Sequence, residues 1–229
     1  MVAQVTTINY PDSDGKPMSD NTKQFRWIQI IEQNLEWLYA DDSQVFIAGD
    51  LLWYPVEGRP QIVTAPDVLV VFGRPKGDRG SYKQWEEDNI APQVVFEILS
   101  PSNSKVEMDK KLLFYDRYGV MEYYIYDPDR NQLEGWIRGD NGTLENIGEM
   151  NNWNSPRLGI RFEESEEELK LYRPDGTPFH SYSEVNNLLL EERQRAEVER
   201  QRAEAEKQRA EEMEALLVKY RAQFGDLNP

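Results

Sequence analysis

Apolar residues recur at intervals of three and four near the N-terminus, a spacing typical of one face of an α-helix. A helix-capping residue type, at Asp20 or Asn21, stands just before the first of them. We therefore expect an amphipathic helix that buries its apolar face in the domain core. The residues of that face are Phe25, Ile28, Ile31, Leu35 and Leu38.

Further along, short apolar runs bounded by turn residues replace the helical spacing, which indicates strands. A second helical stretch, 105–118, ends before Gly119, a residue type that commonly terminates helices. The turn at 127–131 joins two strands into a hairpin. This succession of elements predicts an α/β domain of the α+β type, a mixed sheet flanked by helices. The expected strands are 44–48, 51–54, 68–72, 93–99, 122–126 and 133–137.

The C-terminal segment repeats a seven-residue unit, Arg-Gln-Arg-Ala-Glu-Val-Glu, that begins at Arg193. Alanine occupies one heptad position of each repeat until Leu217 takes that position, while Glu199 and Glu206 occupy the companion position. Opposite charges three and four residues apart stabilise such a helix even in isolation. A solvated single helix and a two-stranded coiled coil are both compatible with this pattern.

Composition narrows the chemistry that the chain can perform. It has no cysteine and a single histidine, His180, which excludes thiolate zinc sites, cysteine nucleophiles and histidine-rich metal sites. Catalysis would then rest on carboxylates, lysine, tyrosine or backbone groups. The N-terminus lacks the pattern of a signal peptide, and no apolar run is long enough to span a bilayer. We therefore expect a cytoplasmic protein that does not contact membranes.

Charge is distributed unevenly over three expected segments: a flexible arm (1–19), the α/β domain (20–182) and a charged heptad helix (183–229). The net charge is −16, and residues 191–229 hold eight basic and ten acidic side chains, so −14 falls on residues 1–190. This acidity opposes strong non-specific binding to nucleic acid. Basic residues that could contact a phosphate backbone are expected in the polar loop 73–90 and beside the second helix.

Two carboxylates fall on apolar strands, Asp67 at the start of one and Glu97 inside another. A carboxylate among Val, Phe and Ile is costly to bury without a partner such as a divalent cation. With the backbone carbonyl of Ile98, the two carboxylates would form a hard oxygen site suited to Mg²⁺, with Mn²⁺ as a substitute. Lys111 on the next helix would then offset charge on a phosphorane. Taken singly, each side chain also has a structural interpretation. Asp67 is compatible with a turn residue, Glu97 with a solvent-facing position on a half-exposed strand, and Lys111 with a solvated helix surface.

Five short motifs in a fixed order resemble the Uma-two family, a group of proposed endonucleases. The resemblance covers most of residues 20–180 and leaves out the heptad segment. The motifs are Ala-Pro-Asp67-Val, Val-Val-Phe-Glu97-Ile-Leu-Ser-Pro-Ser, Lys111-x3-Tyr115, Gly119-Val-x-Glu122-Tyr and Asp127-Pro.

The resemblance implies a restriction-endonuclease-like fold with a PD-(D/E)XK nuclease site in which Asp67 and Glu97 are metal ligands. The parent pattern has a lysine two residues after the second acid, where this sequence has Leu99. The resemblance implies that a lysine on the following helix, Lys111, has taken over that role. The further site residues that it implies are Lys110, as a neighbouring substitute, and Glu107.

Two functions from different classes compete at this point. The first is a Mg²⁺-dependent endonuclease that hydrolyses DNA and, because the domain is acidic, binds it weakly and only with metal. The second is a non-catalytic interaction protein that keeps the nuclease fold and assembles through its C-terminal helix. We also expect a homodimer, with that helix as one candidate interface.

Overall fold

A computed structural model describes residues 8–15 and 17–225. The chain divides into two compact units, Met1–Ser181 and Tyr182–Pro229. The elements of the first unit are α1 (Thr22–Leu38), β1 (Val45–Gly49), β2 (Trp53–Tyr54), β3 (Val68–Phe72), β4 (Tyr82–Lys83), the 3₁₀ turn η1 (Gln84–Glu86), β5 (Val94–Ile98), α2 (Lys105–Tyr118), β6 (Glu122–Asp127), β7 (Gln132–Arg138), β8 (Leu144–Asn146), β9 (Arg161–Glu163) and β10 (Lys170–Tyr172). The second unit contains α3 (Tyr182–Phe224).

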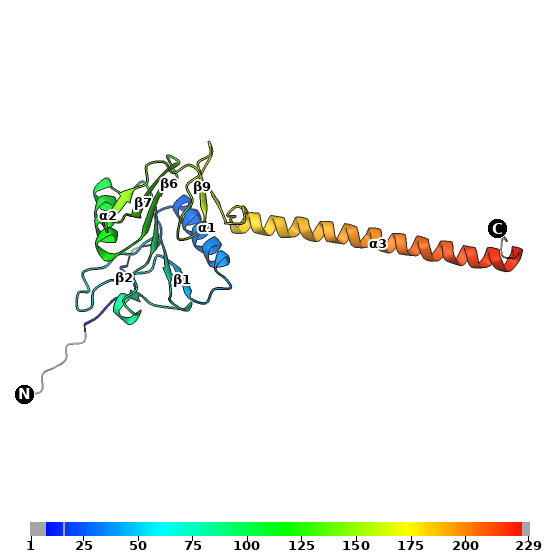
Figure 1. The fold of residues 1–229 in the computed structure, drawn as a ribbon, viewed down its shortest axis with the longest axis horizontal. Helices are drawn as coiled ribbons and strands as arrows, with labels where there is room; N and C mark the ends of the chain where they lie inside the picture. Colours follow the sequence, from blue (N-terminus) through cyan, green and yellow to red (C-terminus); the bar gives the residue numbers. More distant parts are fainter. Residues whose placement is uncertain (1–7, 16, 226–229) are drawn as a thin grey trace, which may run out of the picture. The chain divides into compact units, whose positions relative to one another are not determined.

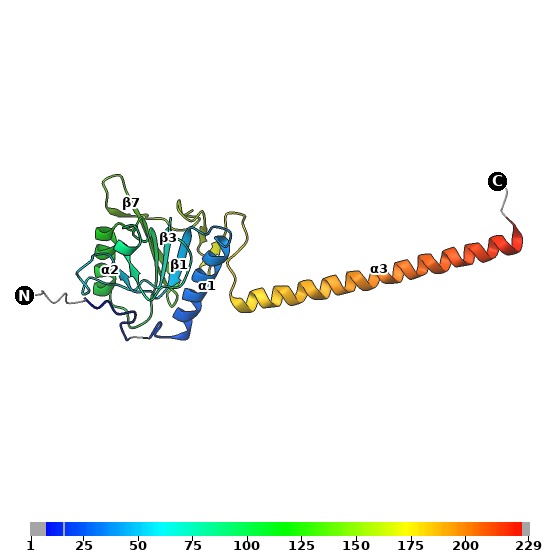
Figure 2. The same ribbon diagram turned by 90° about the horizontal axis from the view of Figure 1, so that it is seen from below.

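A six-stranded mixed sheet forms the centre of the first unit, in the order β1-β3-β5-β6-β7-β8. Within this sheet only β5 and β6 pair in parallel, and α2 provides the connection that a parallel pair requires. α1 and α2 lie on opposite faces of the sheet (Figures 1 and 2). Two small sheets, β9 with β10 and β2 with β4, complete the unit. The expected α/β architecture, a mixed sheet flanked by helices with a long C-terminal helix, is confirmed.

α1 begins where the sequence predicts, because the Asn21 side chain accepts a hydrogen bond from the backbone N–H of Gln24. Its buried face differs from the prediction in one place. Phe25 is 37% exposed, whereas Trp27 and Ile30 are buried. The prediction for Phe25 was wrong because the spacing of three and four also fits a face that starts at Trp27, and only packing against the sheet decides between them.

Alternation along the central strands separates two hydrophobic cores. In β5, Val94, Phe96 and Ile98 belong to the core beneath α1, whereas Val95 belongs to the core beneath α2. β3 alternates in the same way. α2 is bounded as expected, and Gly119 adopts a left-handed conformation with φ 91° just after it. Residues at odd positions of β5 therefore face α2.

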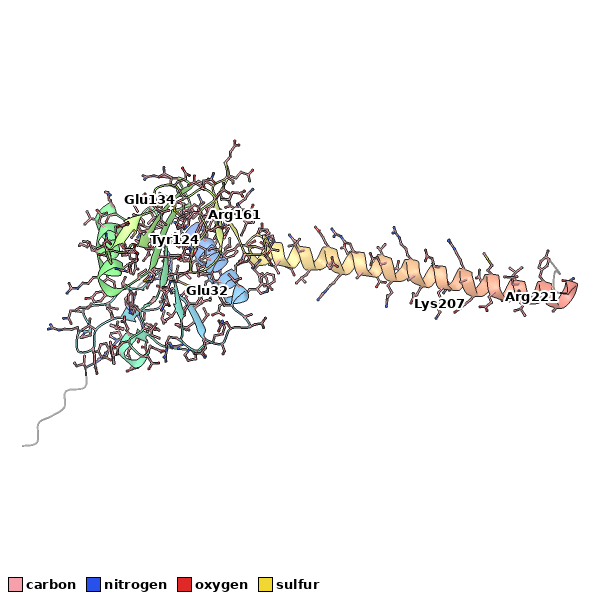
Figure 3. The ribbon with its side chains drawn as sticks, viewed as in Figure 1. Glu32, Tyr124, Glu134, Arg161, Lys207 and Arg221 are labelled. Carbon is pink, nitrogen blue, oxygen red and sulfur yellow. The ribbon has the colours of Figure 1, made fainter. Side chains whose placement is uncertain are left out.

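α3 is exposed along almost its whole length, and ion pairs between successive turns support it. The pairs join Arg195 with Glu191, Arg200 with Glu197 and Lys207 with Glu211. Side chains such as Lys207 and Arg221 project outward from the helix (Figure 3). Among the described residues, no helix combines the length and the apolar character needed to cross a bilayer.

Candidate functional site

Strand register brings the two predicted carboxylates to the same place on the α2 face of the sheet. The antiparallel β3–β5 ladder pairs Val68 with Phe96, so one further step along the ladder sets Asp67 opposite Glu97. Both side chains are buried, with Asp67 8% and Glu97 2% exposed. The start of one strand and the end of its neighbour thus place two carboxylates together within an otherwise apolar layer.

Two side chains from α2 satisfy the buried Glu97 carboxylate. The Lys111 ammonium lies 2.7 Å from Glu97 Oε2, and the Tyr115 hydroxyl donates to Glu97 Oε1. The two partners are four residues apart and therefore share one face of the helix. Tyr115 is completely buried and stacks parallel to Trp53. The packing of α2 on the sheet therefore fixes the orientation of Glu97.

Asp67 lies in a different electrostatic environment. Its Oδ2 accepts a hydrogen bond of 2.6 Å from the backbone N–H of Ile98. Burial, followed by repulsion from the Glu97 carboxylate, raises the pKa of Asp67 to about 8, although Lys111 and the Ile98 N–H both favour the charged form. Additional positive charge placed beside Asp67 would therefore favour the ionised form of its carboxyl group.

Lys111 carries the positive charge of the site. Burial alone would lower the pKa of its ammonium group, but attraction to Glu97 and Asp67 outweighs that effect and holds the pKa above its ordinary value. The lysine is therefore charged, and its side chain still reaches solvent. Its positive charge attracts both carboxylates and so offsets part of the repulsion between them.

A cavity of about 430 Å³ opens next to these groups. Asp67 and Lys111 lie in its wall, whereas Glu97 lies behind Lys111 and does not line it. Among the residues that the structure describes, five carboxylates and one ammonium group face the cavity, which makes this lining acidic. These residues are Asp14, Asp20, Asp50, Asp67, Glu107 and Lys111.

Asp50 is a site residue that the sequence reasoning missed. It follows β1 in a left-handed conformation with φ 49°, an uncommon one for a residue with a side chain. Its N–H donates to the backbone carbonyl of Asp67. Burial, followed by repulsion from Asp14, raises the pKa of Asp50. A polar residue directly after a strand-ending Gly49 was the available signal.

The remaining predicted residues fall at three different places. Glu107 lines the cavity one turn before Lys111. Lys110 is exposed on α2 and does not line the cavity, so the structure does not bring it to the site. The backbone carbonyl of Ile98 accepts a hydrogen bond of 2.8 Å from the side chain of Gln24. Gln24, which also lines the cavity, is the second residue that sequence reasoning missed.

The basic residues of loop 73–90 do not contribute to the cavity. Arg74 pairs with Glu87 and Asp88, and Arg79 pairs with Glu87 while lying 3.9 Å from the centre of the Phe46 ring. Lys76 and Lys83 pair with other acidic side chains. The expectation that this loop offers a basic surface beside the site was wrong, because its cations are matched by nearby carboxylates.

The donor chemistry of the cavity suits a hydrated divalent cation. Mg²⁺ prefers oxygen ligands and keeps several waters when one or two carboxylates hold it. Asp67 supplies such oxygens at the cavity wall, whereas Glu97 lies outside the lining and both of its oxygens are contacted by Lys111 and Tyr115 in this structure. Within residues 8–15 and 17–225, no three His, Cys, Asp or Glu side chains form a ready metal cluster. An ion bound beside Asp67 would therefore take most of its ligands from water.

Comparison with known proteins gives one informative match. No curated protein matches the chain. The crystal structure of a "putative nuclease" from Anabaena variabilis has 18% sequence identity and a TM-score of 0.44, over 62% of this chain and 74% of that one. The model of the Uma2 family, described as "Putative restriction endonuclease", matches residues 15–160. That range holds both carboxylates and the lysine of the site. Because the match covers more than half of the chain, the chain belongs to the Uma2 (Uma-two) family.

Proposed function

We propose that the protein is a metal-dependent endonuclease that hydrolyses phosphodiester bonds in DNA. The family supports a nuclease-type function. The observation that supports this site is the ion pair between Glu97 and Lys111, held beside Asp67 at the wall of an open cavity. Hydrolysis consumes one water, breaks one P–O ester bond and leaves a phosphomonoester and a free hydroxyl.

Asp67 and Glu97 would hold Mg²⁺, or Mn²⁺ in its place, together with water. Bound there, the ion would polarise a phosphoryl oxygen and lower the pKa of a bound water. Lys111 lies beside the same carboxylates and reaches solvent, so it would stabilise the negative charge that develops on the phosphorane. Tyr115 would keep Glu97 in place without touching the substrate.

Cleavage assays with matched variants test this proposal. Supercoiled plasmid and an end-labelled single-stranded oligonucleotide are incubated with Mg²⁺ or Mn²⁺ and with Asp67→Asn, Glu97→Gln, Lys111→Met or Lys110→Met. We expect the first three variants to lose activity by roughly a hundredfold or more, the usual effect of removing a charge stabiliser. Lys110→Met, a neighbour that does not line the cavity, should cleave like the wild type. Cleavage that survives Glu97→Gln in a folded protein would overturn the assignment.

The alternative, assembly without turnover, is favoured by a feature of α3. Met213, Leu216, Leu217 and Tyr220 lie on one face over two turns, and each is more than half exposed. The partner that fits this stripe is a second copy of α3 in parallel register, because the stripe is its own complement. The companion heptad positions nearer the N-terminus hold glutamates, whose like charges would keep two copies apart there. We therefore propose a homodimer held by the end of α3, which is compatible with either function.

A further inference from the structure

The described residues before α1 have no regular secondary structure, but Tyr10 and Pro11 pack against the domain and form hydrogen bonds with it. The Tyr10 ring packs edge-on to Tyr54, with ring centres 5.2 Å apart, and lies 4.9 Å from the Trp85 ring. The Tyr10 hydroxyl accepts a hydrogen bond from the N–H of Gly58. Tyr54 in turn donates to the backbone carbonyl of Pro11, at 2.8 Å. One end of the segment is thus held by an aromatic cluster and two hydrogen bonds.

The next residues continue the attachment along the domain surface. Ser81 donates to the Asp12 carboxylate at 3.2 Å. A Cβ atom added at Gly80 would lie 2.4 Å from the Asp12 Cγ, so a larger residue at position 80 would displace the Asp12 side chain. Asp12 is thus held against the residues that lead into β4.

The other end of the segment is fixed beside the N-terminus of α2. Asp20 Oδ2 accepts hydrogen bonds from the hydroxyls of Ser100, at 2.6 Å, and Ser102. The backbone N–H of Asp20 donates to the side chain of Gln24 at 2.8 Å. These contacts bind the segment to the loop that precedes α2, and the loop lies next to the cavity.

Between the two attachments, the segment forms one wall of the carboxylate cavity. Asp14, Pro17, Met18 and Ser19 line it from this side. Asp14 also acts electrostatically on Asp50 across the cavity. With Asp20, the segment supplies two of the five carboxylates that face the cavity among the described residues, where Lys111 is the one cation. We call residues 10–15 and 17–20 the strap.

We propose that the strap restricts the carboxylate cavity to single-stranded or frayed nucleic acid and excludes intact duplex. This inference rests on the nuclease function proposed above. Duplex DNA is a stiff rod with one negative charge per about 1.7 Å of its axis, so its backbone needs an open surface with little negative charge. The described residues of the strap form one wall of the cavity and add two carboxylates to it. A single strand is flexible and less densely charged, and it can bend past the wall toward Asp67 and Lys111.

The first test releases the strap. Tyr10→Ala removes the ring that packs between Tyr54 and Trp85, and Tyr182→Ala removes an exposed tyrosine of α3 as a matched control. We expect Tyr10→Ala to raise the ratio of duplex to single-strand cleavage by roughly tenfold, because the wall and its charge move away from the substrate path. The control should leave that ratio unchanged. Asp14→Asn, which keeps the wall and removes one charge, should raise it by less.

The second test locks the strap reversibly. The chain has no cysteine, so Asp12→Cys combined with Gly80→Cys introduces only one thiol pair, at two positions whose side chains would touch. We expect the oxidised protein to cleave single strands at the wild-type rate. It should cleave duplex more slowly than the same protein after reduction. A ratio that neither release nor locking alters would overturn the inference.

Binding measurements separate failure of the strap from failure of the nuclease proposal. Fluorescence anisotropy with labelled single-stranded and duplex oligonucleotides, in Ca²⁺ and without turnover, reports access directly. If no variant cleaves DNA, the nuclease proposal fails. Tighter duplex binding by Tyr10→Ala would then still support the strap, and unchanged duplex binding would reject it.

Discussion

Lys111 Nζ lies 2.7 Å from Glu97 Oε2, although the two residues are on different elements and 14 positions apart. In the parent nuclease pattern the lysine stands two residues after the acid on the same strand, and here Leu99 holds that position, packed partly buried in the α2 core. α2 follows β5 closely and packs on the same face as Glu97, so a helix lysine reaches the carboxylate that a strand lysine would reach elsewhere. We propose that Lys111 supplies from the helix the charge that the parent pattern supplies from the strand.

Moving the lysine back to the strand should therefore rescue activity. Lys111→Met is expected to lower cleavage by roughly a hundredfold, because the charge beside Glu97 and Asp67 is lost. Adding Leu99→Lys in the same protein should recover part of that loss, since position 99 lies on the Glu97 face of the sheet. Rates on a single-stranded oligonucleotide measure both effects, and Leu99→Met controls for changed packing. No recovery in a folded double variant would argue against a purely electrostatic role for the lysine.

Tyr115→Phe should weaken metal use more than maximal rate. The hydroxyl donates to Glu97 Oε1, and without it the carboxylate loses one of the two contacts that orient it. Loss of such a supporting contact commonly reduces metal affinity by about 10- to 100-fold. We expect half-maximal activation to need more Mg²⁺ by that order, with a smaller change in kcat at saturating metal. Tyr118→Phe, one turn further along α2, is the matched control, and a kcat loss that excess Mg²⁺ does not reverse would contradict the positioning role.

The stability of the metal-free protein should fall as pH rises from about 4 to about 8. Asp67 has a folded-state pKa of about 8 against an ordinary value of 3.8. Between these values the folded state binds a proton that the unfolded chain does not, so the free energy of unfolding decreases with pH. Full ionisation of this one group would cost on the order of 5 kcal/mol, a large share of the stability of a typical domain.

Urea unfolding at about pH 5 and at about pH 8.5, on either side of the Asp67 pKa, measures this effect. Asp67→Asn should flatten the dependence, whereas Asp109→Asn on the exposed face of α2 should not. Mg²⁺ added at the higher pH should stabilise the wild type more than Asp67→Asn, because a cation bound there favours the ionised carboxylate. An identical pH dependence in wild type and Asp67→Asn would show that this carboxyl group does not titrate as described.

The fold was largely predictable because its elements carry local signals. α2 has a Ser104 cap and Gly119 at its end, β3 is an uninterrupted apolar run, and the hairpin has a turn with Asn131 in a left-handed conformation. Each of these features depends on neighbours within a few residues. β2 was less predictable, since only Trp53–Tyr54 of the expected 51–54 pair with another strand.

The site was predictable only where burial conflicts with charge. Glu97 could be found because an acid inside an apolar strand needs a partner. Gln24 and the strap residue Asp14 reach the cavity through tertiary packing, and no local pattern marks them, whereas the only local signal for Asp50 is its place directly after Gly49. In loop 73–90 the sequence led to the opposite error. Its basic residues were expected to contact a phosphate backbone, but in the structure they form ion pairs. The partner of Lys76, Glu36, is too distant in the chain for spacing to reveal, whereas the other basic residues of the loop pair with acids of the same loop that only its folded conformation brings together.

The stripe at the end of α3 makes the oligomeric state sensitive to single charges. Leu217→Glu would place a carboxylate between Met213 and Tyr220, and in a paired helix it would face the same charge on the other copy. We expect this variant to be monomeric at concentrations where the wild type dimerises. Val218→Glu, an exposed apolar residue one position further and on a different face of the helix, should leave the dimer intact. Sedimentation equilibrium of the full chain measures both, and circular dichroism checks that α3 stays helical. A wild type that is monomeric over the whole range would remove the dimer from either proposed function, while a dimer that survives Leu217→Glu would place the interface elsewhere on the chain.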